Sequence, residues 1–326
     1  MLVPQYWAEA RLRERSKERG QVTLRRFGWS DESPEAAQAM ADERVAAAME
    51  RWRTGELPHQ SEPKVAYNGA DGVPIREEII ERHGESVITR NGYGALCLNT
   101  PNVLFADIDF RNEPHPALKF GCWYLLFATG CIWAYLSGSW LPFFIGLVVS
   151  LILFNEIAAQ FNALIDQHTG GAVNRALKDV RAHVQEHPFW SLRIYRTPNG
   201  LRVLAMHDLF DPRSDETAAL FKSLRADKLY VSMCRNQNCF RARLSPKPWR
   251  IGMEQRLRPQ PGVWPVAPER IPARREWVAE YENMAVSFAA CRYQETIGEG
   301  AHHPAAEAIR DLHDRLCQAD SKLPLA

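Results

Sequence analysis

Residues 120–155 read FGCWYLLFATGCIWAYLSGSWLPFFIGLVVSLILFN and contain no Lys, Arg, Asp or Glu. One membrane-spanning helix needs about 20 apolar residues, so this run is too long for a single helix. Residues 137–139, Ser-Gly-Ser, and Pro142 interrupt the run near its middle, where turn residues belong. The run therefore predicts a transmembrane helical hairpin, about 117–136 and 140–162. A buried hairpin of a soluble protein is the alternative, and the density of Trp, Phe, Leu and Ile without charge argues against it.

The charges that flank the hairpin predict its orientation. Lys119 precedes the hairpin, and Arg175, Lys178 and Arg181 follow it. Because positive charge is enriched on the cytoplasmic side of membrane proteins, both flanks are expected in the cytoplasm. The first 20 residues have no apolar core, so no signal peptide is expected. We therefore expect an inner (cytoplasmic) membrane protein that contacts the lipid bilayer through residues 117–162 and has its soluble domain in the cytoplasm.

The rest of the composition is that of a soluble protein. All 79 charged side chains, 40 basic and 39 acidic, lie in the other 290 of the 326 residues. An apolar content of 46% excludes a disordered chain, and a net charge of +1 excludes a polybasic protein of the histone type. The seven cysteines are odd in number and thinly spread, which argues against a secreted disulfide framework and favours a reducing compartment.

Hydrophobic periodicity on both sides of the hairpin predicts an α+β fold. From residue 103 the order is strand, helix, strand, strand, helix, strand, once the hairpin is treated as an insertion. This is the order of a ferredoxin/RRM-like βαββαβ core, here with extra N-terminal strands and flanking helices. In that fold the first and third strands, here 103–110 and 201–207, are central neighbours. The predicted strands are 86–90, 94–99, 103–110, 189–196, 201–207, 229–233 and 240–245, with helices from 173 to Pro188 and over 214–225.

Composition divides the chain into four regions. Residues 1–84 are predicted as an N-terminal helical region, and residues 85–250 as the α+β core that contains the hairpin. Residues 251–273 are a Pro-rich arm, and residues 274–326 form C-terminal helices. The helices expected outside the core are 7–19, 34–53, 75–83, 274–295 and 303–318.

Two aspartates at the end of a predicted central strand are the sharpest chemical feature. In the run FADIDF, residues 105–110, Asp107 and Asp109 project to one face because alternate side chains of a strand share a face. Paired carboxylates suit hard divalent cations, so we predict that Asp107 and Asp109 bind Mg²⁺ or Mn²⁺ and act in catalysis. The alternative is a solvated strand end whose carboxylates pair with neighbouring arginines.

Basic residues on two later strands could complete the site. Arg202 lies on the strand expected beside Asp107, and it could hold a phosphate or pair with an aspartate. In the run FRARLSPKPWR, residues 240–250, Arg241 and Arg243 share one strand face, and Lys247 extends the basic patch beside an aromatic ring. Guanidinium groups suit phosphate oxygens, and an aromatic ring can stack on a base. The alternative is a basic rim that binds nothing specific.

The remaining cysteines and histidines are weaker indications of a functional site. Cys234 and Cys239, with His207 and Cys97 on other predicted strands, are a weak zinc candidate, because zinc sites usually use tighter paired spacings. Buried free thiols are the favoured interpretation. The sequence contains no GxxxxGK, GxSxG or GxGxxG motif.

The Asp-x-Asp strand, the 193–207 hairpin and the 240–247 run together resemble the archaeo-eukaryotic primase superfamily, the primase-polymerases. The same residues are also similar to bacterial membrane proteins without an assigned role. The primase resemblance covers about 85–250 and implies an RRM-like catalytic half, metal at Asp107 and Asp109, and nucleotide phosphate contact for Arg241 and Lys247. Where the family has a histidine, this chain has Arg202.

A third acid of the primase family is not placed by the sequence. Asp208, Asp211 and Asp227 are its candidates.

Three functions are open at this stage. The first is a membrane-tethered, primase-polymerase-like nucleotidyltransferase with a nucleotide or nucleic-acid partner. The second is a degenerate relative that binds nucleotide or nucleic acid without chemistry, which the missing histidine favours. The third is a membrane-associated Asp-x-Asp glycosyltransferase, which the predicted strand order disfavours.

Overall fold

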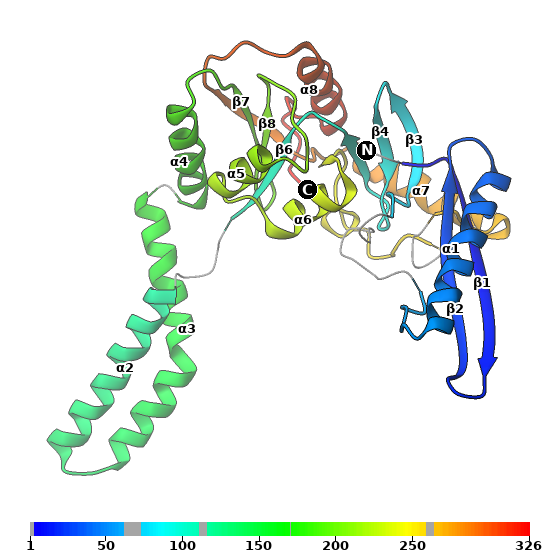
Figure 1. The fold of residues 1–326 in the computed structure, drawn as a ribbon. Helices are drawn as coiled ribbons and strands as arrows, with labels where there is room; N and C mark the ends of the chain where they lie inside the picture. The colour runs from blue at the N-terminus through cyan, green and yellow to red at the C-terminus, as the bar shows by residue number, and fades with distance from the viewer. Residues whose placement is uncertain (1–2, 62–72, 111–115, 170, 259–263) are drawn as a thin grey trace.

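The computed structural model describes five stretches of the chain, 3–61, 73–110, 116–169, 171–258 and 264–326. Over these stretches the protein is α+β, with three antiparallel sheets and one pair of long apolar helices (Figure 1). Residues 62–72 of the predicted N-terminal region and residues 259–263 of the predicted Pro-rich arm lie outside the described part.

The composition had indicated a helical N-terminal region, but this region contains strands as well as one helix. The predicted helix 7–19 is wrong, because strand β1 (Tyr6–Ser16) pairs along its whole length with β2 (Gly20–Ser30). Ala, Glu and Arg favour helix locally, but pairing with a neighbouring strand overrides such a weak preference. Helix α1 (Pro34–Thr54) was predicted and covers the apolar face of this hairpin.

The first four-stranded sheet has the order β10-β7-β8-β6. Strand β8 lies between β6 and β7 and is antiparallel to both, and Asp107 pairs with Arg202 across β6 and β8. The predicted neighbours 103–110 and 201–207 are therefore adjacent. The bounds are β6 Phe105–Asp109, β7 Leu192–Thr197, β8 Gly200–Ala205 and β10 Arg292–Ile297.

Helices cover both faces of this sheet and thereby fix where each side chain points. Ala106 and Ile108 of β6 pack into the cluster that contains α4 (Gly171–Glu186) and α5 (Asp215–Ser223). Phe105 packs in a second cluster, which includes α8 (Pro304–Cys317). Strand alternation therefore directs Asp107 and Asp109 to the Phe105 face, away from α4 and α5.

The second four-stranded sheet has the order β3-β4-β5-β9, and it changes two predictions. The predicted helix 75–83 is wrong, because its second part is strand β3. Strand β9 pairs with β5 rather than joining the first sheet, so one βαββαβ sheet is not formed. The bounds are β3 Glu78–His83, β4 Ser86–Arg90, β5 Leu96–Thr100 and β9 Phe240–Arg243.

The predicted strand 229–233 is wrong because it lies in helix α6 (Lys228–Gln237). Asp227 caps this helix by accepting a 2.8 Å hydrogen bond from the Tyr230 backbone N–H. Buried Tyr230, Met233 and Gln237 recur at the helical spacing of three and four residues. Near the C-terminus, α7 (Ile271–Ala285) ends ten residues before the predicted 295, and β10 begins within the remaining stretch.

Side chains, rather than a strand ladder, join the two sheets. The Tyr230 hydroxyl donates a 2.8 Å hydrogen bond to the Phe105 carbonyl of β6 and accepts a 3.4 Å bond from the Arg241 N–H of β9. Arg202 Nη1 of β8 donates a 2.8 Å bond to the Arg243 carbonyl of β9. The seam between the sheets is therefore polar, and the candidate site lies along it.

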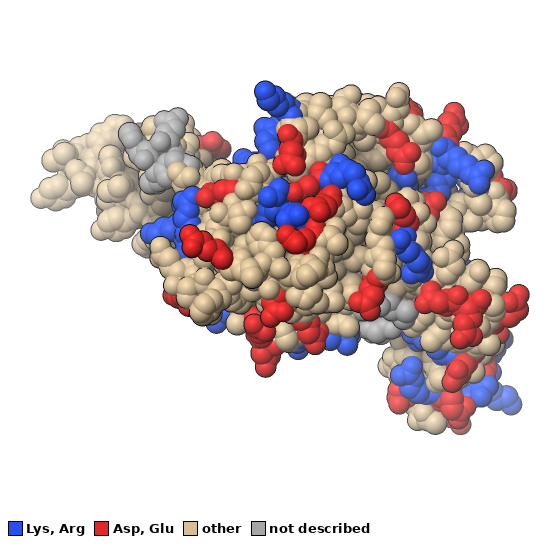
Figure 2. All heavy atoms as spheres, turned by 90° about the horizontal axis from the view of Figure 1, so that it is seen from above, with Lys and Arg blue, Asp and Glu red and all other residues tan. Residues whose placement is uncertain are grey.

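The two apolar helices, α2 (Pro116–Ser137) and α3 (Leu141–Thr169), project from the α+β body (Figure 1). Both are long and apolar enough to cross a membrane. Their apolar side chains are largely exposed; Trp133, Leu136 and Leu141 are 55%, 76% and 66% exposed. Figure 2 shows this projection almost free of charged residues, whereas charges of both signs cover the rest of the face. A soluble core hairpin would bury these side chains instead.

The pairing of α2 with α3 predicts a specific glycine dependence. A Cβ atom on Gly130 would lie 2.8 Å from the Gly146 Cα, and one on Gly146 would lie 2.5 Å from the Gly130 Cα. Close helix contact in membranes relies on such small residues. We expect Gly130→Ala or Gly146→Ala to separate the helices and to lower the melting temperature of the detergent-solubilised protein by several degrees.

Gly121→Ala is the matched control, because a Cβ there meets nothing within 4 Å. Equal melting temperatures for Gly121→Ala and Gly130→Ala would show that the close contact of the hairpin is wrong.

Candidate functional site

A cavity of about 390 Å³ opens along the seam between the sheets. Its walls come from β6, β8, β9, α6, the loop after β9 and the turn between β4 and β5. The six residues that the sequence singled out all line it: Asp107, Asp109, Arg202, Arg241, Arg243 and Lys247. The cavity admits a ligand of the size that protein clefts usually bind.

A third aspartate joins the predicted pair. Asp227 lines the cavity with Asp107 and Asp109, whereas Asp208 and Asp211 do not. The backbone N–H of Asp227 donates a 2.9 Å hydrogen bond to the carbonyl of Asp107, which holds the start of α6 against β6. The sequence left three candidates for this acid, with 227 expected just before a strand over 229–233. The helix cap places it beside the predicted pair.

The acidic side of the cavity repels further negative charge. Burial raises the pKa of Asp109, and the neighbouring Asp227 and Asp107 charges raise it further, while Lys247 and Arg250 oppose that rise. A carboxylate that lies beside other carboxylates is stabilised when a cation binds nearby, because the cation offsets their repulsion. This electrostatic setting suits the Mg²⁺ or Mn²⁺ predicted from the sequence.

The basic side of the cavity contains several positive charges that repel one another. Burial lowers the pKa of Lys247, and the charges of Arg243 and Arg250 lower it further. Burial and the Arg243 charge also lower the pKa of Arg250. Arg243 Nε is buried and has no hydrogen-bond partner among the described residues. Asp109 opposes the lowering of both pKa values, but none of the three cations forms an ion pair with another described residue, and a phosphate group would supply such a partner.

Arg202 and Arg241 have structural partners. Arg202 is 1% exposed, and its Nε lies 3.0 Å from Asp107 Oδ1. Arg241 is also buried, and its Nη2 lies 2.5 Å from Oε2 of buried Glu77. The sequence left a salt bridge open for Arg202 but did not foresee Glu77, because residues 75–83 were expected to form a helix. Arg243, Lys247 and Arg250 are consequently the cations that a ligand can engage.

Aromatic side chains stand beside the basic residues. Tyr93, in the turn between β4 and β5, lines the cavity, and its ring centroid is 5.3 Å from that of Trp249. Lys247 Nζ lies 5.4 Å from the Trp249 ring centroid. Trp249 is 58% exposed and is not itself among the residues that line the cavity.

The aspartates do not form a closed metal cage. Among the described residues, the one group of three or more His, Cys, Asp or Glu with ligand atoms within 4.8 Å of one another is Cys291, His313 and Cys317. The weak zinc candidate of the sequence, centred on Cys234 and Cys239, is not gathered into such a group. Mg²⁺ keeps several water ligands and uses one or two carboxylates with substrate phosphates. The metal at Asp107 and Asp109 therefore stays a prediction.

Comparison of the chain with protein-family models, with curated proteins and with solved structures finds no match in any of the three.

The pKa shift of Asp109 predicts a measurable effect on stability. An acid whose pKa is raised by folding destabilises the folded state at pH values where it is ionised. Asp109→Asn should therefore raise the melting temperature slightly at pH 7, by a few degrees at most because the side chain is partly exposed. The gain should disappear as the pH falls below the ordinary aspartate value of 3.8. Saturating Mg²⁺ should also remove it, by stabilising the original carboxylate.

Asp311→Asn is the control, because its side chain is 67% exposed and lies on α8 outside this cavity. A lower melting temperature for Asp109→Asn at pH 7 would contradict the electrostatic description of the acidic side.

Proposed function

We propose that the protein is a membrane-tethered nucleotide-binding protein of primase-polymerase type. The cavity would hold the phosphates of a nucleotide or nucleic-acid end together with a divalent cation. The separation of unneutralised charge within one cavity carries this proposal. Among the described residues, Asp109 and Asp227 form no ion pair on one side, and Arg243, Lys247 and Arg250 form none on the other, although Lys247 and Arg250 are near enough to oppose the rise in the pKa of Asp109.

A metal–phosphate ligand supplies both missing charges at once. A cation alone would leave the three basic residues unneutralised, and a phosphate alone would face Asp109 and Asp227. Formally, the cavity lining contains five cations and four carboxylates. Because Arg202 pairs with Asp107 and Arg241 with Glu77, three cations and two carboxylates remain. This balance favours a polyphosphate that brings its own divalent ion.

The aromatic residues beside the cations would add a second contact for a nucleotide. Tyr93, which lines the cavity, could stack on a base without selecting its identity. In the primase family, the predicted reaction joins a hydroxyl oxygen to the α-phosphorus of a nucleoside triphosphate and releases pyrophosphate. A divalent ion supplies charge neutralisation and activation of the attacking hydroxyl. Asp107, Asp109 and Asp227 would orient that ion, and Arg243 and Lys247 would hold the leaving phosphates.

The split strand order around β6, β8 and β7 supports an RRM-like core as the basis of this function. Strands β6 and β7 run parallel with antiparallel β8 between them, as in the first three strands of that fold. The fourth strand of the proposed core would correspond to β9, which approaches β6 across the bridged seam instead of by a ladder. A glycosyltransferase of the Asp-x-Asp type would need a larger α/β nucleotide-binding domain.

One observation favours nucleotide binding without transfer as the second function. Arg202 stands where the primase family has its histidine, and its guanidinium occupies one oxygen of Asp107. An ion pair at this carboxylate reduces the charge left for a catalytic metal. The cations and Tyr93 are unaffected by this substitution, so affinity for a nucleotide would persist.

The basic side is tested by removing two cations together. We expect Arg243→Ala with Lys247→Ala to weaken binding of a nucleoside triphosphate in Mn²⁺ by about tenfold or more, because charge-assisted contacts are lost. The salt dependence of single-stranded DNA binding should also become shallower. Fluorescence anisotropy with labelled nucleotide and DNA measures both. Lys222→Ala with Arg256→Ala is the control, since both are exposed and neither lines the cavity.

The same assays separate the two functions. Primer extension that requires Mn²⁺ and disappears in Asp109→Asn, which keeps the Arg202–Asp107 ion pair, would establish nucleotidyl transfer, whereas binding without extension would establish the binder. Equal nucleotide affinity in the cavity variant and the control variant would refute both.

Membrane tethering has its own test. Both soluble flanks are proposed to lie in the cytoplasm, because a hairpin returns the chain to the side it left. Reporter fusions after residues 110 and 180 should both report a cytoplasmic position. A chain that lacks residues 117–162 and has a short linker should be recovered in the soluble fraction with the α+β core intact. Opposite signals from the two fusions would show a single crossing and contradict the hairpin.

A further inference from the structure

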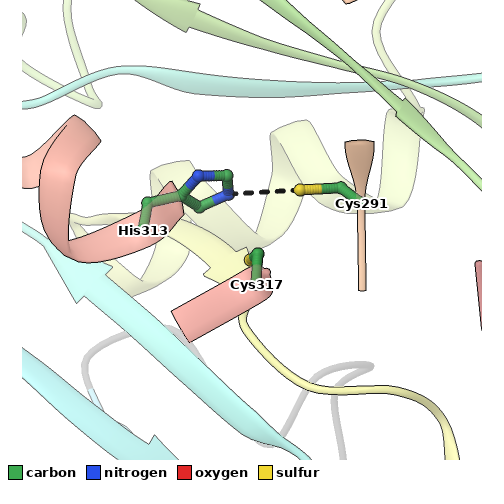
Figure 3. A group of neighbouring side chains, drawn as sticks. All are labelled: Cys291, His313 and Cys317. Carbon is green, nitrogen blue, oxygen red and sulfur yellow. Dashed lines mark hydrogen bonds between the residues drawn. The ribbon is translucent and has the colours of Figure 1, made fainter. Parts of the chain in front are cut away.

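A second group of chemically active side chains lies behind the cavity. Cys291, His313 and Cys317 are each 0% exposed, and their ligand atoms all lie within 4.8 Å of one another. Cys291 directly precedes β10, whereas His313 and Cys317 are on α8. A spacing of four residues places His313 and Cys317 on one face of the helix, one turn apart. Figure 3 shows this face turned toward Cys291.

The distances are close to those of a tetrahedral metal site. Zinc with bond lengths of about 2.3 Å to sulfur and 2.0–2.1 Å to nitrogen separates two such ligands by about 3.6 Å. Cys291 Sγ lies 3.9 Å from His313 Nε2, a few tenths of an ångström longer. The remaining separations fall within the same 4.8 Å limit. Small side-chain rotations would therefore bring all three donors to bonding distance.

The surroundings of His313 already orient it as a metal ligand. Its Nδ1 lies 3.0 Å from Asp314 Oδ1, and the other oxygen of Asp314 accepts a 2.6 Å bond from Arg193. A metal-bound histidine usually donates its second ring N–H to a carboxylate, which fixes the tautomer. The carboxylate of Asp314 thus favours a proton on Nδ1 and directs the lone pair of Nε2 toward the two sulfurs.

The buried cation of Arg202 also contacts this group, so its charge limits which metal ion the group could hold. Arg202 Nη1 lies 3.2 Å from His313 Nε2 and also donates to the Arg243 carbonyl. Its charge is already balanced by Asp107. Two thiolates would then balance a divalent ion, leaving the buried group neutral, which burial requires. On metal binding, the Arg202 N–H would transfer its hydrogen bond from the ring nitrogen to a thiolate sulfur.

We propose that Cys291, His313 and Cys317 form a buried Cys₂His site for a divalent ion of borderline softness, Zn²⁺ in particular. The site would fasten α8 to the start of β10, beside the 3.0 Å hydrogen bond that the Ala290 N–H donates to the Cys317 carbonyl. The Arg243 carbonyl, 3.5 Å from Cys317 Sγ, is the oxygen donor available for a fourth position. Full burial and sulfur ligands make this a structural site, separate from the Mg²⁺ or Mn²⁺ of the cavity.

The test uses the full chain in detergent, reduced and stripped of metal with a chelator. One equivalent of Co²⁺ should produce thiolate-to-cobalt charge-transfer absorption, and one equivalent of Zn²⁺ should abolish that absorption and raise the melting temperature. Loading with Mg²⁺ should do neither. Absence of charge-transfer absorption in the wild-type chain would overturn the proposal, whatever the variants do.

Variants locate the site. Cys291→Ser, Cys317→Ser and His313→Gln should each lose the Co²⁺ absorption or weaken Co²⁺ binding by at least tenfold. Cys234→Ser is the matched control, because Cys234 is an equally buried free thiol outside the group. Unchanged Co²⁺ absorption in all three ligand variants, or its loss in Cys234→Ser, would contradict the assignment. Neither result bears on nucleotide binding, so the two proposals fail independently.

Discussion

The buried guanidinium of Arg202 is the interaction on which the arrangement of both sheets depends. It donates to Asp107 on β6, to the Arg243 carbonyl on β9 and to His313 on α8. Burial disfavours its charge, but Asp107, together with Cys291 and Cys317, more than compensates and holds the pKa of Arg202 above its usual value. Removing Asp107 would leave the buried guanidinium without its counter-ion, at a cost below the about 3–5 kcal/mol of a fully buried pair because the Asp107 side chain is 34% exposed. One side chain therefore joins the aspartate strand, the basic strand and the C-terminal helix.

The polar seam that Arg202 maintains explains why the cavity exists there. A continuous ladder between β6 and β9 would close the gap and leave no space for a ligand. Tyr230 and Arg202 instead bridge the strands with side chains, and α6 is held beside them by the cap at Asp227. The bridging groups satisfy the strand edges without filling the space between them. Unneutralised cations and carboxylates can therefore face each other across the cavity.

Strand parity was sufficient to predict which residues would share the cavity. The alternation in FADIDF and FRAR directs Asp107, Asp109, Arg241 and Arg243 to polar faces, and the structure brings them together. Pairing partners were harder to predict, because they depend on contacts between distant segments. Glu77 opposes Arg241 only because 78–83 is a strand, and β9 joins the second sheet through β5. Such choices depend on tertiary packing, which local propensity does not encode.

Two further errors have identifiable local signals. Residues 228–237 were expected to begin with a strand because LYVSM is rich in strand-forming residues, but Asp227 is a good helix cap. His313 and Cys317 were absent from the predicted site, although their spacing of four on an amphipathic helix pairs two metal-ligand types. That spacing indicates a metal site only when Cys291, which is 22 positions before His313 in the sequence, is known to face the two residues.

The position of the hairpin insertion connects the membrane proposal to the cavity. It interrupts the connection between β6 and α4, which carries no strand pairing, so the sheet remains intact. Asp109 ends β6, and α2 begins at Pro116. Seven residues span at most about 25 Å, so the acidic end of the cavity lies within that distance of the first apolar helix. With the hairpin in the bilayer, the cavity is held close to the membrane surface. In that position a phosphate-bearing ligand would approach through the layer of water next to the lipid headgroups, where Asp107, Asp109 and Asp227 would compete with anionic headgroups for divalent cations.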